Sequence, residues 1–142
     1  MKQRRLILNP LLAIAVTLLL AILVSPAMAD EHNGNVIPLT DADNGRTLDI
    51  PQGSYLTISL KENPTTGANL FAKHSFGLKL ISETYQETPN PRRLTGVGGT
   101  HTWMFKAKGT GDQQFSAVYR QIWEPITGEE DTFVVHLHVI KA

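Results

Sequence analysis

Two histidines are the residues whose type and spacing most directly suggest chemistry. His136 and His138 stand two positions apart, so in a β-strand their imidazoles would share one face, a spacing that can bind Zn²⁺ or Cu²⁺. No acidic or sulfur ligand lies nearby in the sequence, although His101 could approach from another strand. A solvated polar face opposite Phe133 and Val135 explains the same spacing, and the missing ligands favour that interpretation.

Catalytic groups form no recognisable constellation in this chain. The 142 residues include no cysteine, which excludes a thiolate nucleophile, disulfides, thiolate zinc sites and iron–sulfur ligation. No nucleophile-elbow pattern is present either, and a formal net charge of +0 argues against a dedicated nucleic-acid binder. Composition alone does not exclude a hydrolytic triad, but enzyme activity is the function class that these patterns favour least. We therefore predict a protein that is not an enzyme and expect no catalytic residue, metal site or cofactor.

The first of three unusual stretches packs turn-forming and rigid residues together, as Asn63-Pro64-Thr65-Thr66-Gly67. Pro64 fixes its own φ and pushes Asn63 towards an extended conformation, while Gly67 permits a positive φ. Thr65 and Thr66 would then be presented on a stiff binding loop. A plain turn between strands is the alternative interpretation.

The second stretch, Pro89 to Gly99, ends in Gly96-Val97-Gly98-Gly99. These glycines lack the following Lys-Ser/Thr and enter a strand instead of a helix, so a phosphate-binding loop is a poor interpretation. Bare backbone lets another chain approach closely and hydrogen-bond to the main chain. The stretch therefore indicates either a main-chain binding loop or a flexible hairpin connection.

The third stretch follows a segment that ends near Arg120 and contains Gln121, Trp123 and Pro125. An exposed tryptophan is a typical interface anchor, whereas a buried one is ordinary core. Continued alternation from Phe115 would place Trp123 on the buried face. The Glu-Pro step at Pro125 indicates that the strand has ended by then, which favours display of Trp123.

The segments that must position these loops alternate apolar and polar residues, as half-buried β-strands do. Leu56, Ile58 and Leu60, for example, share one face. The predicted strands are Val36–Leu39, Thr47–Ile50, Tyr55–Leu60, Asn69–Lys73, Leu78–Tyr85, His101–Lys106, Phe115–Tyr119 and Phe133–Val139. Turns rich in Gly, Pro and Asn separate them. We predict an all-β fold, an antiparallel β-sandwich of seven to eight strands.

The start of the chain has the features of a secretory signal. A basic beginning is followed by the apolar run Leu11–Val24, which is short for a membrane span. Ala27 and Ala29 then supply the small residues that a signal peptidase reads. We predict a signal peptide over 1–29 and one mature domain over 30–142, exported to the periplasm or secreted, without membrane attachment. An N-terminal anchor helix is the alternative.

In order and spacing, the three stretches resemble the chagasin-type inhibitors of cysteine peptidases. The motifs of that family are Asn-Pro-Thr-Thr-Gly-aromatic, Gly-x-Gly-Gly and Arg-Pro-Trp, and the likeness runs from about Asn44 to Val139. The resemblance implies an Ig-like β-sandwich that carries the three loops at one end. It also implies that the protein works as a monomer whose loops reversibly fill the active-site cleft of papain-like peptidases.

Carried over residue by residue, the resemblance gives each loop a role. Thr65 would lie nearest the catalytic cysteine and histidine of the target, on a loop shaped by its neighbours. Gly96 to Gly99 would pair by main chain with the unprimed side of the cleft, and Trp123 would stack on the primed side. The implied peptidase-binding residues are Asn63, Pro64, Thr65, Thr66, Gly67, Gly96, Val97, Gly98, Gly99, Gln121 and Trp123.

This sequence departs from the family pattern at two places. Ala68 stands where the family has an aromatic residue, and Gln121 and Ile122 stand where it has Arg-Pro. Two other functions stay open: a non-inhibitory Ig-like binding module, and a periplasmic metal-binding protein that uses His136 and His138.

Overall fold

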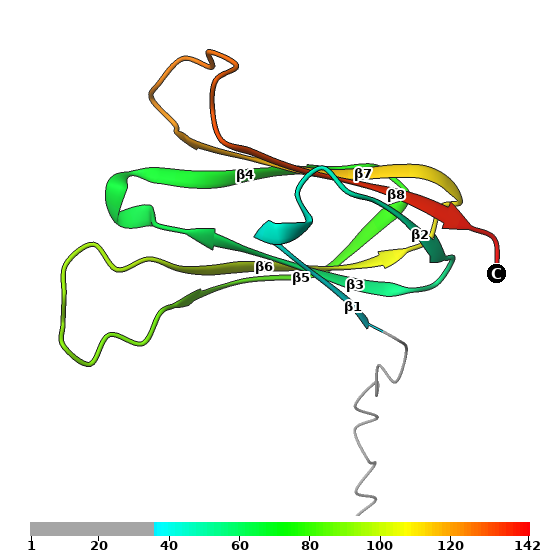
Figure 1. Ribbon diagram of the computed structural model, residues 1–142, viewed down its shortest axis with the longest axis horizontal. Coiled ribbons are helices and arrows are strands. Elements are labelled where there is room, and N and C mark those ends of the chain that lie inside the picture. The colour runs from blue at the N-terminus through cyan, green and yellow to red at the C-terminus, as the bar shows by residue number, and fades with distance from the viewer. Residues whose placement is uncertain (1–35) are drawn as a thin grey trace, which may run out of the picture. The chain divides into compact units, whose positions relative to one another are not determined.

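The computed structural model describes residues 36–142, which form two four-stranded sheets packed face to face (Figure 1). The strands are β1 (Val36–Thr40), β2 (Thr47–Pro51), β3 (Tyr55–Glu62), β4 (Ala68–His74), β5 (Leu78–Glu87), β6 (Gly99–Ala107), β7 (Gly111–Gln121) and β8 (Thr132–Ile140). Every predicted strand is present, most of them slightly longer than the alternation indicates, which confirms the all-β sandwich. The predicted signal peptide over 1–29 lies outside the described residues.

The strand order is β1-β3-β6-β5 in the first sheet and β2-β8-β7-β4 in the second. Four neighbouring pairs are antiparallel, whereas β1 pairs with β3 and β2 with β8 in parallel. The sandwich is therefore antiparallel, as predicted, except at these two edges, where the pairing is parallel. β1 and β2 are joined by a 3-10 turn, η2 (Asp41–Asp43), and lie in different sheets. β1 therefore pairs with β3, and β2 with β8, and neither partner follows directly in the chain. Parallel strands cannot be joined by a tight hairpin turn, so they need a longer crossover connection of this kind.

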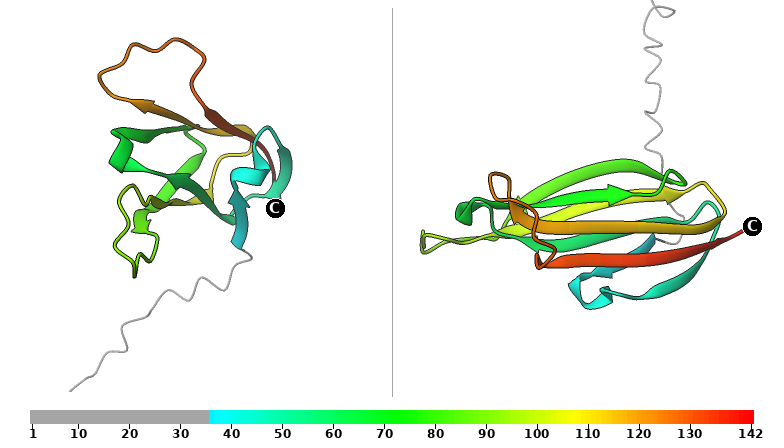
Figure 2. Two further views of the ribbon diagram at one scale, coloured as in Figure 1. Left: turned by 60° about the vertical axis from the view of Figure 1, so that its left-hand side comes forward. Right: turned by 90° about the horizontal axis from the view of Figure 1, so that it is seen from above.

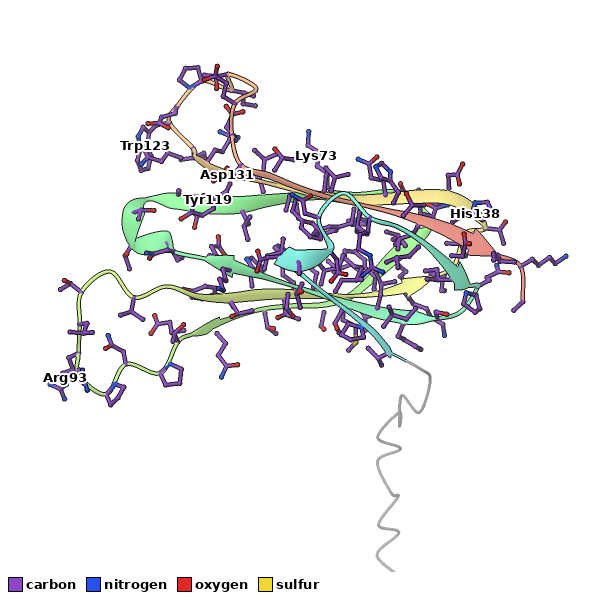
Figure 3. All side chains as sticks on the ribbon, in the orientation of Figure 1. Lys73, Arg93, Tyr119, Trp123, Asp131 and His138 are labelled. Atoms are coloured by element: carbon purple, nitrogen blue, oxygen red, sulfur yellow. The ribbon has the colours of Figure 1, made fainter. Side chains whose placement is uncertain are left out.

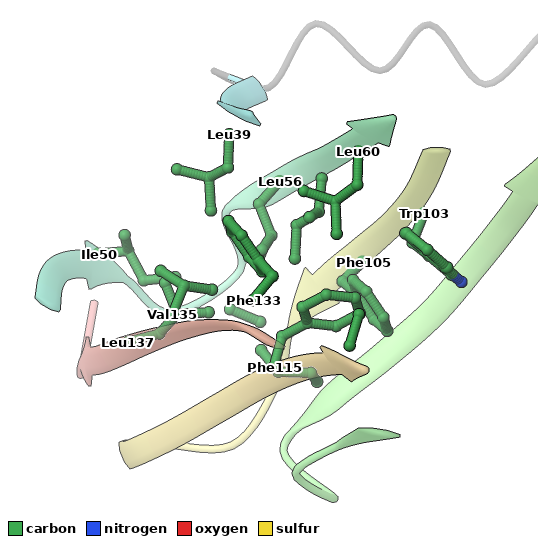
Figure 4. Packing of buried hydrophobic residues seen from close by; sticks show 14 of the residues in the cluster. Leu39, Ile50, Leu56, Leu60, Trp103, Phe105, Phe115, Phe133, Val135 and Leu137 are labelled. Atoms are coloured by element: carbon green, nitrogen blue, oxygen red, sulfur yellow. The ribbon is translucent and has the colours of Figure 1, made fainter. Parts of the chain in front are cut away.

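The core fills the space between the inner faces of the two sheets (Figure 4). Leu56, Ile58 and Leu60 are almost fully buried on β3, as their alternation predicts. The aromatic rings of Phe105 and Phe115 meet edge to face with centroids 5.6 Å apart. Since the chain has no cysteine, this packing is the main source of the domain's stability.

The three unusual stretches all connect strands at the same end of the sandwich. This end lies on the left in Figure 1 and also on the left in the right panel of Figure 2. They join β3 to β4, β5 to β6, and β7 to β8. The opposite end carries the β4–β5 turn at 75–77 and the β6–β7 turn at 108–110. No helix in the described range 36–142 is long and apolar enough to cross a membrane.

Candidate functional site

The loop between β3 and β4, hereafter the first loop, comprises residues 63–67 and contains one turn of 3-10 helix, η3 (Pro64–Thr66). Asn63 caps this turn, because its Oδ1 accepts hydrogen bonds from the Thr65 backbone N–H at 3.3 Å and from the Thr65 hydroxyl at 2.6 Å. Gly67 closes the turn at φ 81°, which confirms the predicted positive φ. The loop is thus held rigid by its own hydrogen bonds.

The two threonine hydroxyls are engaged within the protein. The Thr65 hydroxyl donates to the Asn63 side chain. The Thr66 hydroxyl donates to the Asn63 carbonyl at 2.9 Å and lies 3.3 Å from the Tyr119 hydroxyl. Both hydroxyls therefore stabilise the loop, and the structure gives them no general base of the kind that a nucleophile requires.

The second loop, residues 88–98, packs directly against the first. The Asn63 side-chain amide donates to the Gly96 carbonyl at 3.0 Å. A Cβ atom at Gly98 would lie 2.5 Å from the Glu62 carbonyl oxygen, and one at Gly99 would lie 2.2 Å from the Gln86 carbonyl oxygen. Gly98 and Gly99 are therefore required by contacts within this chain, a reason that the sequence pattern did not reveal.

Val97 is one of the residues of the second loop whose main chain is open, together with Arg92 and Thr95. In the described part of the chain, no hydrogen bond is made to the Val97 backbone, whereas the Gly98 carbonyl accepts from the Thr88 N–H at 3.0 Å. The Gly96 carbonyl is likewise engaged, by Asn63. At the tip, the Asn90 side chain exchanges hydrogen bonds with both backbone groups of Leu94, so this part of the loop is a closed turn.

The third loop, residues 122–131, is tied to the first. The Gln121 side-chain amide donates to the Thr66 carbonyl at 3.1 Å. Trp123 is 67% exposed, and its ring lies over Gly67, where a Cβ atom would approach the ring to 2.4 Å. The strand ends at Gln121, so Trp123 is displayed, as the Glu-Pro step indicates, and Figure 3 shows it on this loop.

A hydrogen-bonded turn at residues 127–130 orders the part of the third loop that precedes β8. The Glu130 carboxylate accepts hydrogen bonds from the backbone N–H groups of Thr127 and Gly128. These bonds stabilise the ionised form and hold the pKa of Glu130 below its usual value. The Glu130 carboxylate therefore stabilises the conformation of the third loop itself.

Tyr119 connects the first and third loops at their base, a supporting position that the sequence analysis did not single out. Its hydroxyl donates to the Asn63 carbonyl at 3.1 Å, and its backbone N–H donates to the Asp131 carbonyl at 2.9 Å. Tyr119 lies on β7, and Figure 3 shows its side chain close to the base of the third loop. The first and third loops therefore share one support.

Glu62 and His101 form a second support that the sequence analysis missed. Glu62 is only 6% exposed, and its carboxylate accepts from the Leu70 N–H at 2.8 Å and lies 2.6 Å from His101 Nδ1. His101 Nε2 lies 2.8 Å from Glu83, so the imidazole ring bridges the two carboxylates. The alternation of β3 could have predicted that Glu62 is buried, because Glu62 continues the inward-facing series of Leu56, Ile58 and Leu60.

An open cavity of about 690 Å³ lies behind the loops, with Glu62, Leu70, Tyr119 and Phe133 among its lining residues. Glu62 and Tyr119, two of its polar lining residues, are engaged in supporting the loops. The cavity brings no nucleophile together with a base and an orienting group, which is the geometry that hydrolytic catalysis requires.

The histidine pair lies at the opposite end of the second sheet. His138 Nδ1 lies 2.7 Å from Asp112, and this hydrogen bond raises the pKa of His138. His101 does not approach the pair, because it lies on β6 in the first sheet and contacts Glu62 and Glu83. Within residues 36–142 there is no cluster of three or more potential metal ligands.

Comparison with known proteins gives a consistent result. Residues 49–137 match the family model described as chagasin family peptidase inhibitor I42. Chagasin from Trypanosoma cruzi is 28% identical over 103 residues, which are 70% of this chain and 94% of that protein.

Solved structures share the fold. The cysteine protease inhibitor EhICP2 from Entamoeba histolytica has a TM-score of 0.65 at 21% identity, covering 74% of this chain and 96% of its own. The protein ICP from Leishmania mexicana has a TM-score of 0.53 at 28% identity, and the match covers 69% of this chain and 90% of that one.

Proposed function

This chain belongs to the chagasin family of peptidase inhibitors, and from that premise we propose that it inhibits papain-like cysteine peptidases by inserting its three loops into the active-site cleft. Family membership places the chain among inhibitors and not among enzymes, as the sequence predicts. The observation that carries the proposal is the mutual bracing of the loops by Asn63, Gln121 and Tyr119. Loops already held in one arrangement lose little entropy on docking.

Each loop has a proposed role. The first loop enters the cleft, with Thr65 nearest the catalytic cysteine and histidine of the target. The second loop pairs through its main chain with the unprimed side, and the unengaged backbone of Val97 supports this role. Trp123 stacks on the primed side, where its 67% exposure leaves it available.

The departures from the family pattern have local consequences. Gln121, where the family has arginine, donates to the Thr66 carbonyl and so supports the first loop directly. Ala68 is buried and pairs with Gln121 at the start of β4. We propose that these changes adjust which peptidases are bound and leave the mode of inhibition unchanged.

Titration of papain-like peptidases with the domain from Asp30 to Ala142 tests this function, with cleavage of a fluorogenic substrate as the readout. Residues Asn33–Ala142 form a compact unit of their own, so the domain can be studied without the preceding segment. We expect reversible, stoichiometric inhibition without cleavage of the inhibitor. No inhibition across several such enzymes would instead favour a non-inhibitory binding module.

The substitution Thr65→Arg tests the central role of the first loop. A long charged side chain would clash with the cleft and be desolvated there, so inhibition should weaken by at least about a hundredfold, or roughly 3 kcal/mol. Thr110→Arg is the matched control, because Thr110 is also exposed but lies in the β6–β7 turn at the opposite end. Equal inhibition by both variants would exclude Thr65 from the interface.

We also propose that the protein is exported, with the signal peptide over 1–29 removed. The basic start, the short apolar run and the Ala27-Met28-Ala29 step support this proposal. Mass spectrometry of the protein isolated from its producing cells should find an N-terminus at Asp30. A mature protein that retains Leu11–Val24 would instead indicate an N-terminal anchor.

A further inference from the structure

The three loops differ in charge, and the proposed function assigns no role to this difference. The second loop carries Arg92 and Arg93 and no acidic residue between Thr88 and Gly98. The first loop, 63–67, carries no charged side chain. The third loop, 122–131, carries only acidic ones, namely Glu124, Glu129, Glu130 and Asp131. The loop end of the sandwich is therefore basic on one side, neutral in the middle and acidic on the other.

The structure holds the basic side out in a defined position. Asn90 closes the turn through its hydrogen bonds to Leu94, and the Arg93 N–H donates to the Asn90 carbonyl at 3.0 Å. Arg92 and Arg93 are exposed, and Figure 3 shows Arg93 at the tip of the second loop, away from the third. Within residues 36–142 neither arginine takes part in an ion pair.

The acidic side is held in the same way. Glu130 is committed to the turn at Thr127 and Gly128. Glu124, before that turn, and Glu129, within it, are exposed and make no ion pair with another described residue. Their charges therefore face whatever docks on the third loop. Arg120, the nearest basic residue before the loop, directs its guanidinium to the Gln121 carbonyl and over the Phe71 ring.

From this arrangement we infer that the loop end selects its partner by charge. The preferred target is a cysteine peptidase whose cleft is acidic at its unprimed rim and basic at its primed rim. This inference rests on the proposed function, because that function assigns the second loop to the unprimed side and the third to the primed side. Arg92, Arg93, Glu124 and Glu129 are the specificity-determining residues. They act chiefly by accelerating association with a complementary cleft and slowing it with any other.

Charge-reversal variants test the inference against two papain-like peptidases that both lack a pro-segment. One is chosen for a cleft with an acidic unprimed and a basic primed rim, and the other for the opposite pattern. The variants are Arg92→Glu/Arg93→Glu, Glu124→Lys/Glu129→Lys and the combination of all four. The matched control is Lys79→Glu/Lys108→Glu, which changes the net charge by the same amount as the arginine pair but at the opposite end. Association rate constants are measured at low and high salt.

The original protein should associate at least about tenfold faster with the first peptidase at low salt. Each double reversal should lower that rate about tenfold, and the combined variant should prefer the second peptidase. These differences should largely disappear at a salt concentration of about 1 M, where the Debye length falls to about 3 Å. The Lys79→Glu/Lys108→Glu control should change the preference less than twofold.

The outcomes separate this inference from the proposed function. If the protein inhibits both peptidases and the charge reversals do not change the association rate constants, the charge selection is overturned and the proposed function still stands. A control variant with as large an effect as the arginine pair would also overturn it, because net charge would then explain the rates. Failure of the original protein to inhibit either peptidase would contradict the proposed function and the inference together.

Discussion

At the scale of single residues, Gly67 and Trp123 show how a missing side chain shapes the site. Gly67 adopts φ 81°, which L-residues with a side chain rarely adopt. A Cβ atom there would also collide with the Trp123 ring. The absence of a side chain at Gly67 thus permits the turn of the first loop and also leaves room for the Trp123 ring of the third loop.

Replacing Trp123 with alanine should weaken peptidase inhibition by about 2 kcal/mol, or roughly thirtyfold, if this side chain is an interface anchor. The free energy of unfolding should change by less than about 0.5 kcal/mol, since the ring is 67% exposed. Inhibition constants and denaturant unfolding measure the two effects. Ile126→Ala, which truncates another exposed residue of the same loop, is the control. A large loss of stability in Trp123→Ala would show that the ring mainly holds the fold.

His138 provides a pH-dependent contribution to stability that belongs to this scale. Its pKa is raised above 6.5 in the folded protein by the hydrogen bond to Asp112. A folded state that binds the proton more tightly is stabilised below the unfolded pKa, and this stabilisation is lost as pH rises through the folded pKa. An NMR titration of the His138 ring should show the raised pKa, and Asp112→Asn should lower it towards 6.5. An unchanged titration in that variant would rule out Asp112 as the cause.

At the scale of secondary-structure elements, the Glu62–His101 pair connects the strands that carry two loops. Glu62 is the last residue of β3, directly before the first loop. His101 lies near the start of β6, directly after the second loop. The Glu62 carboxylate also accepts from the Leu70 N–H on β4, in the other sheet. One buried carboxylate thus connects both sheets at the base of the site.

Glu62→Gln should lower the free energy of unfolding by about 1–3 kcal/mol, because the buried amide NH₂ that replaces one carboxylate oxygen cannot accept a hydrogen bond, whereas both oxygens of Glu62 have a partner. Peptidase inhibition should weaken as well, since the bases of the first and second loops lose their common support. Glu83→Gln is the control, because the Glu83 side chain is 48% exposed while it also contacts His101, and its effect should be smaller. Chemical denaturation and inhibition assays give both values. Equal effects of the two substitutions would contradict a special role for the buried carboxylate.

At the scale of the whole domain, the two sheets are held by a continuous apolar core that reaches from Leu39 to Val139. Phe115 lies at its centre, fully buried, with its ring in contact with Phe105 and Phe133. Because the chain contains no cysteine, no disulfide supplements this core. The rigidity of the loop end therefore depends on how well the sheets pack beneath it.

Phe115→Ala should destabilise the domain by about 3–5 kcal/mol, because it leaves a large cavity between the sheets. Phe76→Ala is the matched control, since Phe76 is fully exposed in the β4–β5 turn, and its effect should stay within about 0.5 kcal/mol. Urea unfolding followed by tryptophan fluorescence measures both. Similar destabilisation by the two substitutions would show that the core is not centred on Phe115.

The sequence by itself determined the strands and the identity of the loops. Alternation in segments such as Tyr55–Leu60 depends only on which residues face inward, and a strand repeats that choice every second residue. The rigidity of Asn63-Pro64-Thr65-Thr66-Gly67 was also local, because Pro64 and Gly67 restrict or permit their own backbone angles. These features therefore followed from near neighbours along the chain.

Only the tertiary structure decided which distant residues meet. The parallel pairing of β1 with β3, the contact of Gly98 with Asn63, and the seat of Trp123 on Gly67 all depend on strand register and on how the two sheets stack. Glu62 was readable as inward-facing, but its partner His101 is 39 positions away in sequence. Such pairings form when many side chains pack at once, so no local pattern records them.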